Sequence, residues 1–296
     1  MKLDRCPSCE GTRSTPLARW AGLRLVRCEE CTLVYTDPQP REEVRHEYLA
    51  GADLADHFAP LAARKRIIYD RQLKALPAPR PGHDRLCDVG CADGQFLAIA
   101  AERGWSIHGI ELNPPAAARA RKRGAMVFEG AFEELDDLPW GSFDLVTAWN
   151  VLEHTPEPRA FSARLMRLLG EEGTLGLSTL NWDSLVRRTF GERWSMVVPE
   201  HFTYWSVASL TGLLEVLGGT TVASGTYGVG RDFFALLDRV AALRSRARRA
   251  PAGQAPAQPR ASRWDTAGAV VRLERLANRA LAARDDGVAI WVTARQ

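Results

Sequence analysis

From residue 85 to about residue 180 the chain alternates short apolar runs with amphipathic segments, and this alternation constrains the fold more than any other feature. The apolar runs have the length of strands, and helical periodicity fills the intervals between them. Strands that alternate with helices form a parallel sheet with helices on both faces. The expected strands are RLCDVG, SIHGIEL, AMVFEG, FDLVTAW and GTLGLST, followed later by TTVASGTYGV and GVAIWVTARQ.

Composition divides the chain into three parts. Residues 1–40 contain four of the six cysteines, and residues 41–80 show helical patterns that end in a linker rich in proline and glycine. Residues 81–296 hold the α/β domain. Within it, residues 239–263 contain seven arginines and no acid. We interpret that stretch as a solvated insertion, with an arm for an anionic ligand as the alternative.

The charge and the chain start bear on location and partners. The formal net charge of +3 is too small to indicate a nucleic-acid partner by itself. The opening MKLDRCPSCE lacks the apolar core of a secretion signal, and no apolar run reaches the length of a membrane span. We therefore expect a soluble cytoplasmic protein that acts on a small molecule, without a membrane partner. These features leave a homodimer open.

Four cysteines have the spacing of a structural zinc site. Two C-x2-C pairs are separated by 18 residues, which is typical of a zinc ribbon. Four thiolates close the coordination shell, so the zinc would be structural. Acidic and basic residues nearly balance in this unit, which favours a structural or substrate-lid role over nucleic-acid binding. The expected ligands are Cys6, Cys9, Cys28 and Cys31.

The stretch LCDVGCADGQF, residues 86–96, places an acid at the end of an apolar run and then turns through small residues into a helical pattern. Such a turn can hold a dinucleotide or S-adenosylmethionine. A dinucleotide site needs G-x-G-x-x-G, whereas the glycines here are Gly90 and Gly94 with no third glycine in place. S-adenosylmethionine, which has no pyrophosphate, fits better. Asp88 could orient its ammonium group, and the glycines would admit its methionine part.

A second acid, Glu111, ends the next apolar run, 23 residues after Asp88. An acid at that position can accept hydrogen bonds from both ribose hydroxyls. The alternative is a charge that stabilises the helix beginning near Pro114.

Five stretches in order, LCDVGCADGQF, IHGIELNP, FEELDDLPWGSFDLVTAWNVLEHTPEP, RLMRLLGEEGTLGLST and VPEHFTYWSVASLTGLLEVLGG, resemble the class I S-adenosylmethionine-dependent methyltransferases. The group most similar is the ubiquinone-biosynthesis type of O-methyltransferase, including members with an N-terminal zinc ribbon. The resemblance covers roughly residues 1–225 and 287–295. It implies a Rossmann-like, doubly wound sheet of seven strands, mostly parallel, with the last strand antiparallel. The expected cofactor contacts are Asp88, Gly90, Cys91, Gly94, Glu111, Leu112, Ala131, Phe132 and Asn150.

The chain departs from the family pattern at three positions. Ala92 stands where the family usually has glycine, and Ala131 where an aspartate often faces the adenine amino group. Adenine recognition would then fall to backbone groups near Ala131 and Phe132. Some relatives bind a divalent metal through E-x-x-E-H, but Asn150 replaces the first carboxylate here. A catalytic metal at Glu153 and His154 is therefore disfavoured unless His201 joins the set.

Methyl transfer needs alignment and, for a hydroxyl acceptor, removal of a proton. Histidine is the usual base because its pKa lies near neutrality. His201, in the segment that the resemblance places over the cofactor, is the expected general base. His154 is expected beside it, lining the same pocket; packing beside the cofactor is its alternative role. Aromatic residues cluster around both in the sequence and are divided between core packing and an acceptor pocket: Trp149, Trp182, Trp194, Phe202, Tyr204 and Trp205.

The leading hypothesis is a biosynthetic enzyme that transfers a methyl group from S-adenosylmethionine to a hydroxyl of a sugar or natural-product intermediate. An RNA methyltransferase that grips RNA with its zinc ribbon is the second; the balanced ribbon charge and the lack of [DN]-P-P-[YF] after the fourth strand oppose it. A noncatalytic cofactor-binding protein is the third.

Overall fold

A computed structural model describes residues 3–20, 22–39, 62–228 and 280–295. Of the helical patterns expected within residues 41–80, the part up to residue 61 lies outside the described residues, and so does the arginine-rich stretch at 239–263. None of the helices in the described ranges is long and apolar enough to cross a membrane.

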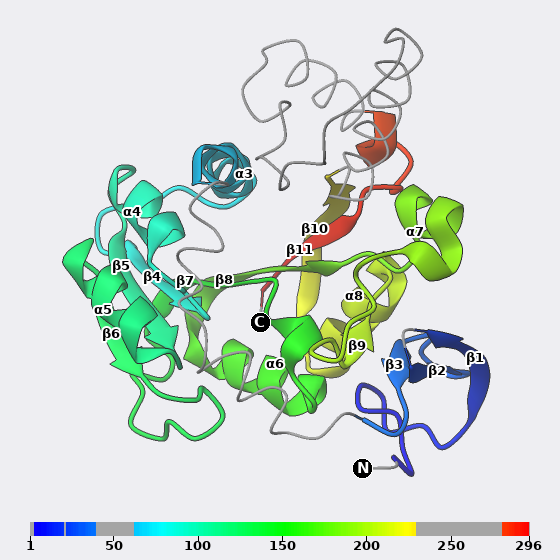
Figure 1. Ribbon diagram of the computed structural model, residues 1–296. Helices are drawn as coiled ribbons and strands as arrows, with labels where there is room; N and C mark the ends of the chain where they lie inside the picture. Colours follow the sequence, from blue (N-terminus) through cyan, green and yellow to red (C-terminus); the bar gives the residue numbers. More distant parts are fainter. Residues whose placement is uncertain (1–2, 21, 40–61, 229–279, 296) are drawn as a thin grey trace, which may run out of the picture.

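The larger sheet has seven strands in the order β10-β11-β8-β7-β4-β5-β6. Neighbours from β8 to β6 are parallel, and β11 runs antiparallel to both β8 and β10. The expected seven-stranded sheet with an antiparallel last strand is thus confirmed (Figure 1). Its strands are β4 (Arg85–Val89), β5 (Ser106–Glu111), β6 (Met126–Glu129), β7 (Phe143–Trp149), β8 (Leu169–Leu180), β10 (Thr220–Tyr227) and β11 (Ala289–Arg295).

Helices cover both faces of this sheet, with α3 and α4 on one and α6 and α8 on the other (Figure 1). Local signals account for where several of them begin. The Asn113 side chain accepts a hydrogen bond from the Ala116 N–H at the start of α5, and Ser206 forms a capping box with Ser209 at the start of α8. The helices are α3 (Ala62–Lys74), α4 (Gln95–Ala101), α5 (Pro114–Lys122), α6 (Pro158–Leu168), α7 (Leu185–Phe190) and α8 (Val207–Val216), with 3-10 turns η2 (Leu152–His154) and η3 (Gly191–Arg193).

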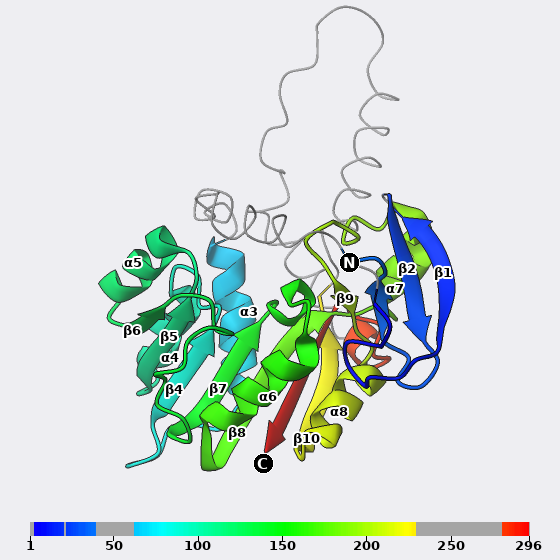
Figure 2. The same cartoon turned by 90° about the horizontal axis from the view of Figure 1, so that it is seen from below.

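A second, four-stranded sheet has the order β1-β2-β3-β9, from β1 (Ser14–Trp20), β2 (Leu23–Cys28), β3 (Val34–Thr36) and β9 (Thr203–Tyr204). The first three strands come from the cysteine-bearing unit, which we call the ribbon (residues 3–39). The fourth comes from the α/β domain. Figure 2 shows the ribbon beside β9 and α7. No pattern in the sequence indicates that the two parts share a sheet.

Three buried clusters fill the interior. One lies between the sheet and α6 and α8 and also includes Cys6, Val26, Cys28, Leu33 and Tyr35 of the ribbon, and one lies between the sheet and α3 and α4. The third cluster also joins the ribbon to the domain. It contains Trp20, Leu25 and Val34 from the ribbon, together with Leu180, Trp182, Val186, Trp194, Val197 and Tyr204.

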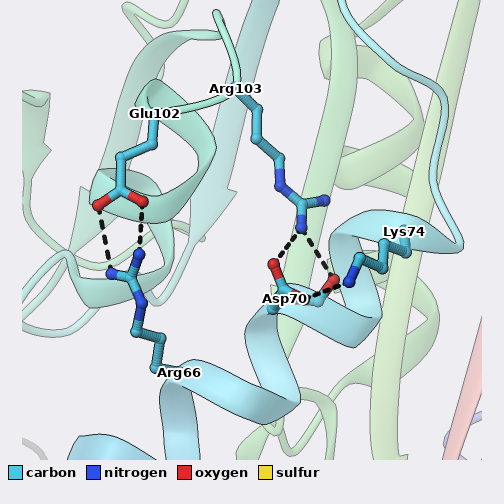
Figure 3. A network of polar contacts seen from close by, with 5 residues as sticks. All are labelled: Arg66, Asp70, Lys74, Glu102 and Arg103. Atoms are coloured by element: carbon cyan, nitrogen blue, oxygen red, sulfur yellow. Dashed lines mark hydrogen bonds and ion pairs between the residues drawn. The ribbon is translucent and has the colours of Figure 1, made fainter.

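Helix α3 is tied to the end of α4 by two groups of ion pairs (Figure 3). Arg66 donates to both carboxylate oxygens of Glu102, at 3.2 and 2.6 Å. The Asp70 carboxylate forms ion pairs with Arg103 and with Lys74. The side chains of Arg66, Glu102 and Lys74 are exposed, so solvent screens these ion pairs and they stabilise the helix only weakly. Packing holds the helix more firmly, because Tyr69 lies edge-on against Phe96, with ring centroids 5.5 Å apart.

Candidate active site

The order of strands in the sheet changes direction at β4. The next two strands along the chain, β5 and β6, lie on one side of β4, whereas β7 and β8 lie on the other. Ligands of open α/β sheets bind at this point, beyond the carboxyl ends of the strands. The loop after β4 turns sharply there, with positive φ at Gly90, Ala92 and Gly94 (73°, 48° and 75°). Gly94 cannot carry a side chain, because a Cβ would lie 2.8 Å from the Ala120 Cα. Ala92, with its φ of 48°, occupies a conformation that favours glycine, the residue usual in the family.

The carboxylate of Glu111 is fixed at the end of β5. Its two oxygens each accept a backbone N–H at 2.8 Å, one from Ala92 and the other from Asn113. Burial raises the pKa of this carboxyl, and the two hydrogen bonds oppose that rise. The N-cap of α5 is Asn113, whose own N–H donates to Glu111. Glu111 is thus a buried, oriented acceptor beside the β4 loop, as a ribose-binding acid requires.

Asp88 lies beneath the loop. The residue is 2% exposed, and its carboxyl accepts a hydrogen bond from the Thr147 hydroxyl on β7 at 2.7 Å. Burial raises the pKa of Asp88 to about 8, and the nearby Glu111 contributes to the rise. A buried acid of this kind is stabilised by a cation placed above it. Thr147 was not among the expected site residues, because no sequence motif marks a hydroxyl on the neighbouring strand.

The remaining expected cofactor contacts surround the same edge of the sheet. Cys91 is buried and lies under Gly109, where a Cβ would be 2.5 Å from the Cys91 Sγ. Phe132 packs edge-on against Phe161, so its ring belongs to the core. Because the side chains of Cys91 and Phe132 pack inside the protein, only the backbone groups of these residues could face a cofactor. Leu112 and Ala131 are half-buried, and Asn150 is exposed with φ of 55°.

Two histidines expected at the reacting end lie side by side. The rings of His154, in η2, and His201, just before β9, have centroids 4.7 Å apart. Nδ1 of His154 is 3.0 Å from the Glu200 carbonyl oxygen, and Nδ1 of His201 is 2.7 Å from that of Met196. A carbonyl can only accept, so both rings carry their proton on Nδ1 when neutral. The basic lone pair of each ring is then on Nε2.

The histidine pair and the β4 loop belong to one region. Gly90 lies against Val151, at the start of η2: a Cβ at position 90 would be 2.6 Å from the Val151 Cγ2. Glu153, also in η2, is 2% exposed and accepts a hydrogen bond from the Thr179 hydroxyl at 2.8 Å. Burial raises the pKa of Glu153 to about 7.

The ligand atoms of Glu153, His154 and His201 lie within 4.8 Å of one another. This set could hold a metal ion, and it is the one that the sequence analysis left open. The other described histidines lie elsewhere: His108 is buried near the Leu86 carbonyl, and His83 is exposed beside Asp144.

Most of the aromatic residues near these histidines in the sequence are core residues. Trp182, Trp194, Phe202, Tyr204 and Trp205 are all buried. Trp149 is half-buried, with its ring centroid 5.3 Å from that of Phe96. Core packing thus accounts for more of this set than the sequence analysis expected.

The four ribbon cysteines form two matching turns. In each, the first cysteine donates its N–H to the residue five positions on, Cys6 to Gly11 and Cys28 to Leu33, and its carbonyl accepts the N–H four positions on. Their sulfur atoms lie within 4.8 Å of one another. None of the four forms a disulfide.

The chemistry of this donor set fits zinc. Burial raises the pKa of Cys9 to about 11, whereas a hydrogen bond from the Cys6 thiol lowers the pKa of Cys31 to about 5. Four sulfurs so close can all ionise only around a cation. The set fits a closed, structural tetrahedral site at Cys6, Cys9, Cys28 and Cys31.

The sheet order, the glycine-containing turn after β4 and the acid that ends β5 define a class I S-adenosylmethionine-dependent methyltransferase fold. A family profile described as "Methyltransferase domain" matches residues 57–224, more than half of the chain. The chain belongs to this family.

Two curated relatives match parts of the chain. Nocamycin O-methyltransferase from Saccharothrix syringae is 40% identical over 117 residues, which cover 36% of this chain and 41% of that protein. Ubiquinone biosynthesis O-methyltransferase from Xanthomonas oryzae pv. oryzae is 37% identical over 103 residues, covering 33% and 43%. The chain thus spans less than half the length of these relatives.

Among solved structures, a SAM-dependent methyltransferase from Archaeoglobus fulgidus has a TM-score of 0.52 at 15% identity. The match covers 86% of this chain and 99% of that one. At this identity the likeness shows the fold.

Proposed function

We propose that this protein transfers the methyl group of S-adenosylmethionine to a hydroxyl of a small molecule, with His201 as the general base. The observation that carries the proposal is the histidine pair beside the β4 loop, since Gly90 contacts Val151 three residues before His154. The O-methyltransferase names of the two curated relatives support oxygen as the acceptor atom.

The cofactor would lie over the ends of β4 and β5. The Glu111 carboxylate would accept the ribose hydroxyls, since each of its oxygens has further lone pairs beyond the one that accepts a backbone N–H. The carboxyl of Asp88, buried beneath the loop, would attract the ammonium group of the bound cofactor. When bound, S-adenosylmethionine supplies an electrophilic methyl group on a cationic sulfur.

The chain's own part in the chemistry is to move one proton. Because the Nδ1 proton of His201 is held by the Met196 carbonyl, Nε2 is the atom that would take the acceptor's proton. The imidazolium that forms would be stabilised by the Glu153 carboxyl, which lies within 4.8 Å of the ligand nitrogens. A base in this position contributes about 10²–10⁴-fold to the rate.

The test is methyl transfer from radiolabelled S-adenosylmethionine to a library of hydroxylated sugars and natural-product intermediates, followed by mass spectrometry of the products. His201→Ala should lower the rate by about 10²–10⁴-fold without changing cofactor affinity. His83→Ala is the matched control, because His83 is exposed in the linker before β4. Unchanged turnover of His201→Ala from about pH 6 to 9 would remove His201 as the base and weaken the assignment to oxygen.

A further inference from the structure

The geometry points to a positioning role for the ribbon: strand β3, through Thr36, holds the His201–His154 pair in place. In this view the ribbon is part of the acceptor end of the active site. The inference rests on the proposed function for its catalytic meaning. Its structural content, that the ribbon sets the place of two imidazole rings, can be tested without any methyl acceptor.

The first link is the ladder between β3 and β9. Val34 pairs with Tyr204, and Tyr35 pairs with Thr203. Thr36 extends the ladder: its N–H donates to the Phe202 carbonyl at 3.0 Å, and its hydroxyl donates to the same oxygen at 3.4 Å. Thr36 is fully buried. The residue directly after His201 is therefore held by the ribbon.

The second link lies on the other side of β9. The Phe202 N–H donates to the Glu153 carbonyl at 2.8 Å, and the Thr203 hydroxyl donates to the Leu152 carbonyl at 3.3 Å. The β9 backbone thus lies between the ribbon and η2, which carries His154. One chain of hydrogen bonds runs from Thr36 through Phe202 to Glu153, and both histidines are adjacent to members of it.

The third link connects β3 to the cysteine cluster. Cys28 ends β2, and its N–H donates to the Leu33 carbonyl at 2.9 Å, directly before β3 begins. Cys31 lies three residues before Val34. The turn that would hold the metal therefore also sets the start of β3, and opening this turn would release the strand that pairs with β9.

Packing makes this connection stiff. Trp20 lies edge-on against Trp182 with ring centroids 5.6 Å apart, and Tyr204 lies 5.6 Å from Trp182. Two polar contacts add to the interface: the Gln39 side chain donates to the Pro156 carbonyl at 3.1 Å, and Arg159 donates to the Ser8 carbonyl at 3.3 Å. Interiors of this kind transmit displacement, because they are close-packed.

A purely stabilising ribbon predicts a different outcome. Its loss would loosen the whole domain, including the far strands and the cofactor site. A positioning ribbon predicts a change centred on β9 and η2, because β4 pairs with β5 and β7 and the Glu111 carboxylate is held by the N–H groups of Ala92 and Asn113.

The experiment uses the full chain with 15N-labelled histidine and follows the imidazole nitrogens by NMR. Zinc is removed with a chelator, and S-adenosylhomocysteine affinity is measured by calorimetry in parallel. After zinc removal we expect the imidazole signals of His154 and His201 to shift or broaden. The signal of His108 on β5 should keep its position, and the affinity for S-adenosylhomocysteine should be unchanged. Thr36→Pro, which deletes the N–H donated to Phe202 but leaves the four cysteines, should give the same pattern with zinc still bound.

Two results would overturn the inference. One is that the His154 and His201 signals remain in place after zinc loss and in Thr36→Pro. The other is that His108 shifts and S-adenosylhomocysteine affinity falls together with them, which would make the ribbon a general stabiliser. Once an acceptor is known, Thr36→Pro should lower kcat with KM for the cofactor unchanged, since a misplacement of about 1 Å costs on the order of 10²-fold. Absence of methyl transfer in the wild-type chain would refute the proposed function and leave the NMR result standing.

Discussion

Replacing Glu111 with glutamine should weaken cofactor binding while leaving the fold intact. Glu111 is 8% exposed, and its two carboxylate oxygens accept the N–H groups of Ala92 and Asn113 at 2.8 Å. Glutamine has one carbonyl oxygen, so it cannot accept both backbone groups and both ribose hydroxyls. Loss of a hydrogen bond to a charged acceptor costs about 1.5–3 kcal/mol, equivalent to roughly tenfold to 150-fold in Kd.

The stability of this variant should change little, because two effects oppose each other. The variant leaves one backbone N–H facing an amide donor, which costs about 1–3 kcal/mol. It also removes a charge whose pKa burial has raised, which returns part of that cost. A loss of affinity can therefore be separated from unfolding by a melting curve.

The assay is isothermal titration of S-adenosylhomocysteine into wild type, Glu111→Gln and the control Glu129→Gln. Glu129 pairs with Glu111 across β5 and β6, but it is exposed and bound to Arg121. The control should bind as wild type does. An unchanged Kd for Glu111→Gln, or equal losses in both variants, would refute the assignment of Glu111 to the ribose.

Three further outcomes are expected. Elemental analysis should find one zinc per chain; less than half an equivalent, with all four ribbon thiols freely alkylated, would contradict the metal site. The free energy of unfolding should fall as the pH rises from about 4, the ordinary pKa of an aspartate, to about 8, because folded Asp88 keeps its proton over this range. Asp88→Asn should flatten that slope in urea titrations at several pH values, and an unaltered slope would place the titration elsewhere. Finally, His154→Ala should change acceptor KM more than kcat, and single-turnover kinetics would show the reverse if His154 were the base.

The sequence predicted the elements of the α/β domain well, because each is defined by local periodicity. Every apolar run expected as a strand is a strand, and the acid expected at the end of one of them, Glu111, lies at the end of β5. The turn after β4 could also be predicted from local sequence, because small residues are typical of backbone with positive φ.

Contacts between distant segments could not be predicted in this way. Thr147 reaches Asp88 across 59 residues, and Thr36 reaches Phe202 across 166. Strand β9 has only two residues, too few to show an alternating pattern. The ribbon therefore looked like a separate unit in the sequence, although it shares a sheet and a buried cluster with the domain.

The most direct test of the central claim is a crystal structure of the full chain with S-adenosylhomocysteine. We expect the ribose hydroxyls on the Glu111 carboxylate, the homocysteine part over the loop from Gly90 to Gly94, and the sulfur on the side of the His154–His201 pair. A ligand bound elsewhere, or a sulfur directed away from both histidines, would contradict the claim.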